Sequence, residues 1–345
     1  MRNLLLASAA MSGFLAPKTM CKKSLMISAA FVAAFAAAPA VAKSALYPLP
    51  LVSGSTETIA FGISTNGNIT GFWLSSTGVE GGFVGPDDGS SYTTFDDSAD
   101  GAGTQPRGIN NKGTIMGIAN VSTGIATDYV PFERTPDGTI THVTKGGQVL
   151  NYLVQGINKS NIFDGGYETS TSEFIGYTGK NAKYKSKIKL KGITTTGVAP
   201  RGIDNAGDTV GWYLDTTGVM HGFYQPVRGK AVTIDDPGGV TNPEGINNKG
   251  EISGLYTDSS SNRHGFTYDI ATATFTELTV PSSTFVEVWG LNDHGQVAID
   301  GLDSTTGLYV GYIYCPSARN CPGGAAAVKR PVLHRSALPV PRQMP

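Results

Sequence analysis

A tripeptide that reads Gly-Ile-Asn, or a close variant of it, recurs six times along this chain of 345 residues. Self-similarity at a period of roughly 20–50 residues indicates a repeat architecture, in which neighbouring units together bury a core that one unit cannot bury alone. The spacings between successive copies are 46, 48, 46, 43 and 45 residues, because the copies begin at Gly62, Gly108, Gly156, Gly202, Gly245 and Gly290.

Each repeat predicts four short strands. In the fifth copy, the hairpin-type turn Asn-Asn-Lys-Gly at 247–250 leads into segments 251–256, 264–268 and 274–280, and 285–291 opens the next copy. The 45 glycines are about 13 % of the chain against a usual ~7 %. This content excludes a long-helix or coiled-coil protein, and collagen is excluded because the glycines do not fall at every third residue. Four strands in about 45 residues are typical of a propeller blade.

The two ends of the repeat region predict a closed ring. The sixth copy has strand-like segments at 285–291, 296–301 and 308–314 but no fourth strand. At the other end, segment 45–52 has no partner in its own repeat, and its prolines suit an edge strand. We therefore predict an all-β fold over residues 43–321. It is a six-bladed β-propeller of four-stranded blades, with the N-terminal strand closing the last blade. An open β-solenoid would leave both ends unexplained.

Short motifs within the repeats resemble those of a known family. His-Gly-Phe at 221–223 and 264–266, Thr-Ile-Asp-Asp-Pro-Gly at 233–238 and the Gly-Ile-Asn copies resemble the bacterial HAF-type extracellular repeat family. The resemblance covers residues 56–314. The second and third copies depart from it, since Tyr-Val-Pro-Phe at 129–132 replaces the His motif and 156–200 is the most divergent unit. The resemblance implies export and a repeat architecture, and it implies no reaction.

The first 42 residues read as a targeting segment. Lys22 and Lys23 precede an apolar run at 24–38, and Ala-Val-Ala at 40–42 is an A-x-A cleavage site. We expect residues 1–42 to be a signal peptide, with Met20 as a second candidate start; a retained membrane anchor is the alternative. No other stretch approaches the ~18 apolar residues that span a bilayer. The expected location is secreted or periplasmic in a bacterium, with no membrane span after cleavage.

The expected export decides which cysteines and charges the mature protein keeps. Cys315 and Cys321 remain after cleavage, and in an oxidising compartment such a pair predicts a local disulfide. No His or Cys cluster lies near them, so no metal site is predicted. Residues 43–345 hold 22 basic and 27 acidic residues, a net charge of −5, which gives no case for nucleic-acid binding. Residues 322–345 read as a disordered tail.

The residue just before each Gly-Ile-Asn copy varies where the repeat is otherwise fixed. The first strand of a propeller blade is innermost, so these six side chains should form a layer near the central channel and its mouth. Arginine binds carboxylate or sulfate through paired hydrogen bonds, and tryptophan offers a stacking face for a sugar ring. The alternative is that the six side chains point between blades and pair with one another. The candidate ligand-binding residues are Phe61, Arg107, Gln155, Arg201, Glu244 and Trp289.

A run of lysines stands out against an acidic background. Residues 180–191 hold six lysines and no acidic residue, whereas the rest of 43–321 holds 12 basic and 27 acidic residues. On a strand, Lys185, Lys187, Lys189 and Lys191 would all point to one face. Their position predicts the outer strand of the third blade. They either protect an exposed edge from aggregation or form a basic stripe for an anionic polymer or the bacterial surface.

The remaining polar groups are expected to be structural. His221 and His264 occupy the same slot in two copies, whereas a catalytic group is usually singular in a repeat array. Acidic pairs on the inter-blade loops could hold calcium or act as an acid/base pair, but turn formation is expected. No Gly-x-Ser-x-Gly, His-Glu-x-x-His or phosphate-loop pattern is present, so neither a catalytic residue nor a cofactor is predicted. The acidic residues concerned are Asp96, Asp97, Asp100, Asp235 and Asp236.

The sequence thus favours an exported, monomeric, non-enzymatic binding or surface-interaction module. Its expected ligand is an extracellular carbohydrate or a cell-surface polyanion, bound at the channel mouth or along the lysines. Two alternatives stay open: a polysaccharide-cleaving lyase or hydrolase acting at the channel mouth, and a structural envelope protein. An enzyme should show one copy with an acid/base cluster that its siblings lack, and Arg201 with Glu244 is the adjacent-blade pair of that kind.

Overall fold

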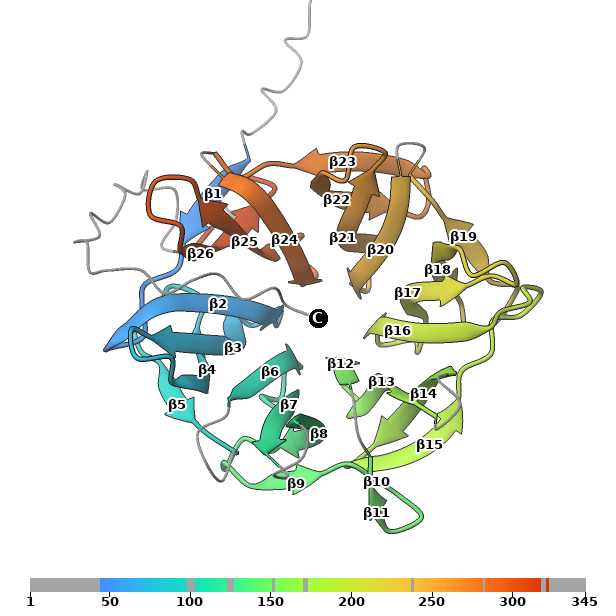
Figure 1. Cartoon of the computed structure of the whole chain (residues 1–345), viewed down its shortest axis with the longest axis horizontal. Coiled ribbons are helices and arrows are strands. Elements are labelled where there is room, and N and C mark those ends of the chain that lie inside the picture. Colours follow the sequence, from blue (N-terminus) through green and yellow to red (C-terminus); the bar gives the residue numbers. More distant parts are fainter. Residues whose placement is uncertain are drawn as a thin grey trace, which may run out of the picture. The chain divides into compact units, whose positions relative to one another are not determined.

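The computed structural model describes residues 44–97, 103–122, 127–150, 153–169, 173–236, 239–281, 283–317 and 321–322. This part of the chain contains strands and no α-helix, and its six small sheets are arranged around a central axis (Figure 1). The predicted six-bladed β-propeller is confirmed. The predicted signal peptide at 1–42 and all but the first residue of the predicted tail lie outside the described residues.

Each blade is a meander of strands that runs from the centre outward (Figure 1). The innermost strands are β2 (Ser55–Ile63), β6 (Thr104–Ile109), β12 (Leu153–Ile157), β16 (Gly197–Ile203), β20 (Gly239–Ile246) and β24 (Ser283–Leu291). The second strands are β3 (Asn68–Ser75), β7 (Ile115–Ser122), β13 (Ile162–Glu168), β17 (Thr209–Leu214), β21 (Glu251–Asp258) and β25 (Val297–Asp303).

The third and fourth strands complete the blades. The third strands are β4 (Glu80–Pro86), β8 (Thr127–Arg134), β14 (Phe174–Lys180), β18 (Met220–Gln225), β22 (Arg263–Asp269) and β26 (Tyr309–Cys315). The fourth strands are β5 (Thr93–Phe95), β9 (Ile140–His142), β15 (Lys183–Lys187), β19 (Val232–Ile234), β23 (Thr274–Leu278) and, for the sixth blade, β1 (Ala45–Pro48).

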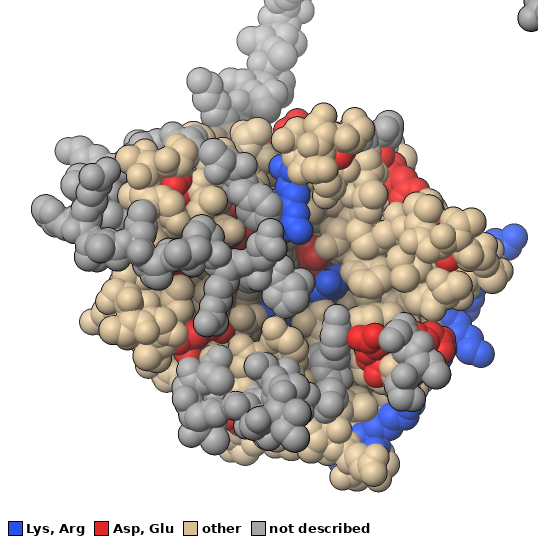
Figure 2. Space-filling view, in the orientation of Figure 1, with Lys and Arg blue, Asp and Glu red and all other residues tan. Residues whose placement is uncertain are grey.

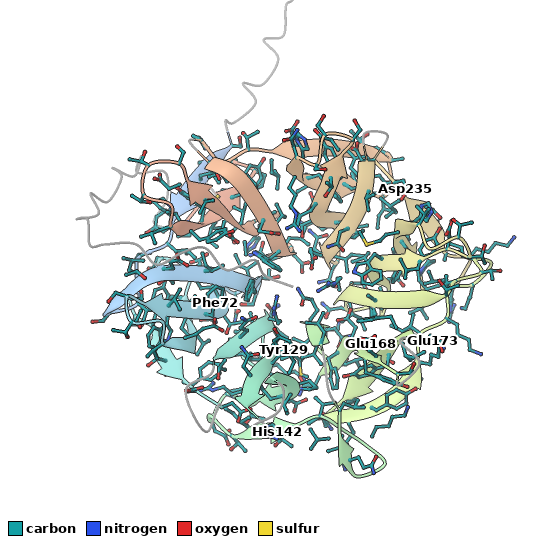
Figure 3. All side chains as sticks on the ribbon, viewed as in Figure 1. Phe72, Tyr129, His142, Glu168, Glu173 and Asp235 are labelled. Atoms are coloured by element: carbon teal, nitrogen blue, oxygen red, sulfur yellow. A yellow bond between two sulfur atoms is a disulfide. The ribbon has the colours of Figure 1, made fainter. Side chains whose placement is uncertain are left out.

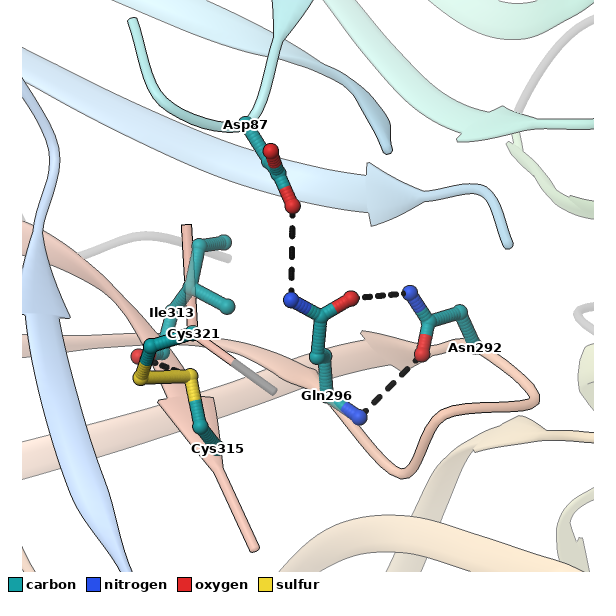
Figure 4. Close-up of a disulfide and its surroundings, with 6 residues drawn as sticks. All are labelled: Asp87, Asn292, Gln296, Ile313, Cys315 and Cys321. Atoms are coloured by element: carbon teal, nitrogen blue, oxygen red, sulfur yellow. Dashed lines mark hydrogen bonds between the residues drawn. A yellow bond between two sulfur atoms is a disulfide. The ribbon is translucent and has the colours of Figure 1, made fainter. Parts of the chain in front are cut away.

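The N-terminal strand closes the ring as predicted. β1 pairs antiparallel with β26, with Ala45 opposite Cys315 and Pro48 opposite Tyr312. The predicted disulfide joins Cys315, at the end of β26, to Cys321 (Figure 4). Nearby, the Gln296 side chain in the sixth blade donates to Asp87 in the first. Strand pairing and polar contacts therefore both join the two ends of the repeat array.

The third blade has two strands more than the repeat pattern predicts. β10 (Thr144–Lys145) and β11 (Gln148–Val149) form a small hairpin in the connection from the second blade. β10 pairs in parallel with the outer strand β15 through Thr144 and Lys183. This hairpin covers the start of the outer edge of the third blade.

The glycine content is explained by aromatic packing within the blades. In five blades, an aromatic residue of the third strand lies directly opposite a glycine of the second strand, and each of these aromatic side chains is fully buried. A side chain in place of Gly117, for example, would put its Cβ 2.6 Å from the ring of Phe132. The five pairs are Gly71–Phe83, Gly117–Phe132, Gly165–Tyr177, Gly211–Phe223 and Gly254–Phe266.

Each member of the Gly-Ile-Asn motif has a separate role in closing the ring. The glycine lets neighbouring inner strands approach, since a Cβ on Gly108 would lie 2.2 Å from the Gln155 carbonyl oxygen. The isoleucine lines the channel. The asparagine amide donates to a backbone carbonyl of the next blade, as in Asn110 to Asn158, at 3.0 Å, and Asn292 to Ser64, at 3.2 Å. The repeated tripeptide is therefore the element that joins the blades around the axis.

Candidate ligand site in the propeller channel

The residue before each Gly-Ile-Asn copy lies at a β-bulge of the inner strand. In β6, Pro106 pairs with Gly117 and Gly108 with Met116, so that Arg107 is the extra residue. The same register shift occurs at the corresponding place in the other five blades. A bulge bends the strand and redirects the side chain of the extra residue. Five of the six varying residues are thereby presented toward the axial cavity, which Trp289 does not line.

Five of the six predicted ligand-binding residues line one cavity on the axis. The cavity has a volume of about 70 Å³, and at ~10–15 Å³ per water it has room for about five water-sized groups. Charged side chains are visible at the centre of the face shown in Figure 2. The five residues are Phe61, Arg107, Gln155, Arg201 and Glu244.

A ring of aliphatic side chains forms the floor of this cavity. Each of the six is at least nine-tenths buried, and all of them also border a second cavity of about 80 Å³ that the Asn-containing turns line. The apolar ring therefore separates a charged compartment from an amide-lined one. Its members are Ile63, Ile109, Ile157, Ile203, Ile246 and Leu291.

Glu244 is the carboxylate of the charged compartment. Its side chain is buried and accepts hydrogen bonds from Asn242, at 2.6 Å, and from Gln155 across the channel, at 3.3 Å. Nε of Arg201 lies 4.0 Å from Oε1 of Glu244. Burial raises the pKa of Glu244, and the charges of Arg201 and Arg107 oppose that rise.

Arg107 brings a second positive charge to the same compartment. Its guanidinium carbon lies 4.4 Å from the ring centre of Phe61 and 5.5 Å from that of Trp289, and it donates to Gln105 at 2.6 Å. Burial and the nearby charge of Arg201 lower the pKa of Arg107 to about 10. Arg107 is thus still charged at neutral pH.

Trp289 does not offer the stacking face that the sequence suggests. Its side chain is 8 % exposed and meets Phe61 edge to face, with 4.3 Å between ring centres. Its indole Nε1 donates to Asp300 at 2.6 Å. Trp289 therefore supports the cavity wall beneath Arg107, and its ring is covered because the first and sixth blades pack against each other here.

Several polar atoms around the cavity have no hydrogen-bond partner within the described part of the chain. They include the Nε donors of Arg107 and Arg201 and the Oε1 acceptor of Gln155. Oδ1 of Asn242, next to Glu244, and Oδ2 of Asp164 are further acceptors of this kind. Buried polar atoms without partners are rare in folded proteins. Their concentration here marks a place where a polar ligand or ordered water fits.

Asp164 is a member of this group that sequence reasoning missed. It is fully buried in β13, and its Oδ1 accepts from the Gly156 amide at 2.6 Å. Burial raises the pKa of Asp164 to about 7, although Arg201 opposes the shift. Aligning the repeats could have found it, because the other copies carry a neutral residue at this position: Thr70, Met116, Val210, Ser253 and Ala298.

Sequence reasoning also missed a carboxyl pair in the sixth blade. Glu287 and Asp300 lie directly opposite each other in β24 and β25, and both are buried. Glu287 forms an ion pair with Arg263, and Asp300 accepts from Trp289. Burial raises the pKa of Glu287 to about 7 and that of Asp300 well above its usual value. In the position of Asp300 the other copies carry Phe72, Ile118, Gly166, Trp212 and Leu255.

His221 and His264 line neither of the two channel cavities. His221 stacks on Tyr213 between Asp235, at 2.7 Å, and Asp215, at 3.6 Å. His264 repeats this arrangement on Tyr256, between Asp258 and Glu277. Figure 3 labels Asp235 near the outer strand β19 and His142 on the outer strand β9. The two equivalent histidines make the same kind of contact, which agrees with the structural role expected for them.

The acidic loop residues contact strand hydroxyls. Oδ1 of Asp96 accepts from the Thr104 hydroxyl, and the backbone amide of Asp236 donates to the equivalent Thr241 hydroxyl. Asp100 lies outside the described residues. Among the described residues, no group of three or more His, Cys, Asp or Glu side chains is placed to hold a metal ion.

The four predicted lysines lie on the outside of the third blade, and all are exposed. The strand expected there is shorter than predicted: β15 ends at Lys187, and a bulge makes Lys185 the extra residue opposite Thr178 and Gly179. The lysines are therefore separate from the channel.

In the residues that the structure describes, no helix is long and apolar enough to cross a membrane.

Comparison with known proteins adds resemblances in fold. No family model and no curated protein matches the chain. Among solved structures, TolB from Acinetobacter baumannii is similar at 13 % identity and a TM-score of 0.47, over 72 % of this chain and 63 % of that chain. This chain therefore spans less than two thirds of the TolB chain.

Two other solved structures are matched over nearly their whole length. A gluconolactonase of Xanthomonas campestris, XC5397, is similar at 11 % identity and a TM-score of 0.48, over 80 % of this chain and 91 % of that one. YjhT is similar at 10 % identity and a TM-score of 0.48, over 79 % of this chain and 98 % of that one. Similarity at this level carries no conclusion about ligand or reaction, so function must be argued from the site.

Proposed function

We propose that this protein is an exported, non-enzymatic binding module that holds an acidic extracellular carbohydrate at its channel mouth. The observation that carries the proposal is the state of Arg201. Its side chain lines the cavity, is 19 % exposed and has an ion-pair contact at 4.0 Å, and within the described residues it donates no hydrogen bond. A guanidinium that donates no hydrogen bond within the protein is suited to a carboxylate ligand, which it can bind through two parallel hydrogen bonds.

The other cavity groups support a ligand with both charge and hydroxyls. Among the residues that line the cavity, Arg107 and Arg201 bring two positive charges against the one carboxylate of Glu244. Burial raises the pKa of nearby Asp164 to about 7, so the balance favours an incoming anion. The unpartnered oxygens of Gln155 and Asn242 can accept from hydroxyl groups. A cavity of about 70 Å³ accommodates a carboxylate and an adjoining hydroxyl, so the rest of the sugar would lie outside it.

Export and family form part of the same proposal. The signal-like residues 1–42 support export, and the Cys315–Cys321 disulfide suits an oxidising compartment. The His-Gly-Phe and Gly-Ile-Asn motifs support membership of the HAF-type extracellular repeat family. N-terminal sequencing of the protein recovered from the periplasm or the medium tests the export step, with Lys43 as the expected first residue.

Calorimetric titration tests the binding proposal. The purified protein is titrated with glucuronate, galacturonate and sialate, and with glucose and galactose as neutral controls. We expect at least one acidic sugar to bind and the neutral sugars not to. Arg201→Gln should weaken that binding about 10- to 100-fold, since hydrogen bonds to charged groups contribute ~1.5–3 kcal/mol. The matched control is Lys249→Gln, at an exposed turn lysine outside the cavity, which should bind like the parent. Equal binding by Arg201→Gln would contradict the proposal.

A second candidate function, cleavage of a polysaccharide, is favoured by the Glu287–Asp300 pair. This pair is present in one blade and absent from the other five, and carboxyl groups with raised pKa values are typical of acid/base sites. Both groups are already bonded within the fold, to Arg263 and Trp289, which is why binding is the first proposal. Release of new reducing ends or unsaturated ends from an acidic polysaccharide, abolished by Glu287→Gln, would establish cleavage instead.

A further inference from the structure

The lysine-rich segment runs from the third blade onto the fourth, held in one orientation by its apolar residues. Ile188 and Leu190 are more than nine-tenths buried, in the same cluster as Tyr213 and Phe223 of the fourth blade. The lysines that alternate with them are all exposed. Burial of the intervening residues therefore forces this row of cations outward, whether or not the backbone is part of a strand.

Basic residues of the fourth blade extend the row. The Lys191 amide donates to the Gln225 side chain at 2.7 Å, and the Ala231 amide donates to the Lys191 carbonyl at 2.9 Å. These contacts bring the end of the row to the turn between β18 and β19, where Arg228 and Lys230 are exposed. We call the whole set the basic rim; its members are Lys183, Lys185, Lys187, Lys189, Lys191, Arg228 and Lys230.

Few carboxylates offset this charge. Glu173, labelled in Figure 3, pairs with Lys187 at 3.2 Å. The two oxygens of Asp208, the acidic residue that contacts the β18–β19 turn, accept from the Val227 amide and the Tyr224 hydroxyl. Figure 2 shows basic side chains at the edge of the molecule beside the third and fourth blades. The rim is thus a positive strip on a chain whose net charge is −1.

Protection of a strand edge does not account for the row. β10 already covers the outer edge of β15 at Lys183. Lys189 and Lys191 lie beyond the end of β15, and both backbone groups of Lys191 are bonded to the fourth blade. Edge protection therefore explains Lys185 and Lys187 alone. Lys191 donates from Nζ to the Val227 carbonyl at 2.9 Å, whereas Lys189, Arg228 and Lys230 make no side-chain hydrogen bond or ion pair within the described residues.

We propose that the basic rim is a docking site for a linear acidic polysaccharide. Lys187, Lys189 and Lys191 alternate with buried Ile188 and Leu190 beyond the bulge at Lys185. Alternate residues of an extended chain lie about 6.6–6.8 Å apart, so this part of the rim presents its positive charges along one line. A chain molecule with repeated negative charges can contact such a line throughout, whereas a flat membrane surface would favour cations spread over a face. The rim is separate from the channel, and this inference does not depend on the function proposed for the channel.

Dextran sulfate, with unsubstituted dextran as the neutral polymer of the same backbone, tests the inference. Biolayer interferometry at 50 and 150 mM NaCl should show the protein binding dextran sulfate but not dextran. Lys185→Gln/Lys189→Gln should weaken that binding about 10-fold at the lower salt and reduce its salt dependence. The matched control is Lys112→Gln/Lys249→Gln, two exposed turn lysines, which should change the affinity less than about twofold.

Three results would overturn the inference: equal loss in the control double variant, no loss in the rim double variant, or no binding of dextran sulfate by the parent. A separate binding experiment uses vesicles containing phosphatidylglycerol. Rim-dependent binding to these vesicles, without binding to dextran sulfate, would assign the rim to a membrane surface and overturn the polysaccharide. Lys185→Gln/Lys189→Gln should bind the acidic monosaccharides of the channel test like the parent, so a failure at the rim is distinguishable from a failure at the channel.

Discussion

Nε of Arg201 lies 4.0 Å from Oε1 of Glu244, and the two side chains come from equivalent positions of neighbouring blades. Each is the extra residue of a β-bulge just before its Gly-Ile-Asn copy. The carboxylate has further partners in Asn242 and Gln155, whereas the guanidinium makes this one ion pair and no hydrogen bond among the described residues. The pair is therefore asymmetric, with a satisfied anion beside a cation that can still bind.

Glu244→Gln should strengthen acidic-sugar binding. The substitution removes the one carboxylate of the ring that competes with a ligand for Arg201, and both arginines remain. A charge about 7 Å away in a partly hydrated site contributes ~1 kcal/mol, so we expect the acidic sugar to bind about 3- to 10-fold more tightly. Calorimetry at low salt measures the change. Weaker binding than in the parent would show that Glu244 contacts the ligand itself.

Asp164→Asn should stabilise the protein at alkaline pH. Because burial raises the pKa of Asp164 to about 7 from 3.8, the folded state holds a proton that the unfolded state releases. The parent therefore loses stability as the pH rises from about 4 to above 7. At ~1.36 kcal/mol per pKa unit, the neutral amide should recover up to about 4 kcal/mol at pH 8. Urea unfolding at pH 5 and pH 8 measures this, and equal effects at both pH values would contradict it.

His221 and His264 should titrate above pH 6.5. Hydrogen bonds to Asp235 and Asp258, respectively, are the main causes that raise the pKa of each imidazole. A raised pKa means that their stabilising contribution is full below pH 6.5 and is lost as the pH rises through the folded-state pKa. NMR titration of the imidazole Cε1–H signals measures both values directly. Midpoints at or below 6.5 would show that these contacts do not persist in solution.

Gly108→Ala should be strongly destabilising because the position has no room for a Cβ. The added carbon would lie 2.2 Å from the Gln155 carbonyl oxygen of the next blade, and a strand backbone cannot yield as a flexible side chain can. We expect a loss of about 1–3 kcal/mol or more in unfolding free energy.

Gly197→Ala in β16 is the matched control, since its nearest contact is the Phe174 Cβ at 3.3 Å. We expect a change of less than about 1 kcal/mol there. Chemical denaturation compares the two variants. A Gly108→Ala protein as stable as the Gly197→Ala protein would contradict the role of the glycine ring.

Blade number, closure and the disulfide followed from the sequence because each depends on a local pattern. The Gly-Ile-Asn copies mark the inner strands, and the incomplete sixth copy and the unpaired segment 45–52 together predicted the pairing of β1 with β26. The extra β10–β11 hairpin was not predictable. Its strands have only two residues each, and β10 is stabilised by pairing with β15, about 40 residues later in the chain.

The sequence by itself determined that six variable side chains hold one position in six similar copies and lie near the channel, and five of them line the axial cavity. Tertiary structure alone decided what each side chain does there. Gln155 and Glu244 are 89 residues apart and bond across the channel, while Trp289 is covered by Phe61 from the opposite end of the array. The physical reason is that ring closure sets which blades meet. Burial between those blades then fixes which groups are paired, which carboxyls keep their protons and which cations remain free to bind.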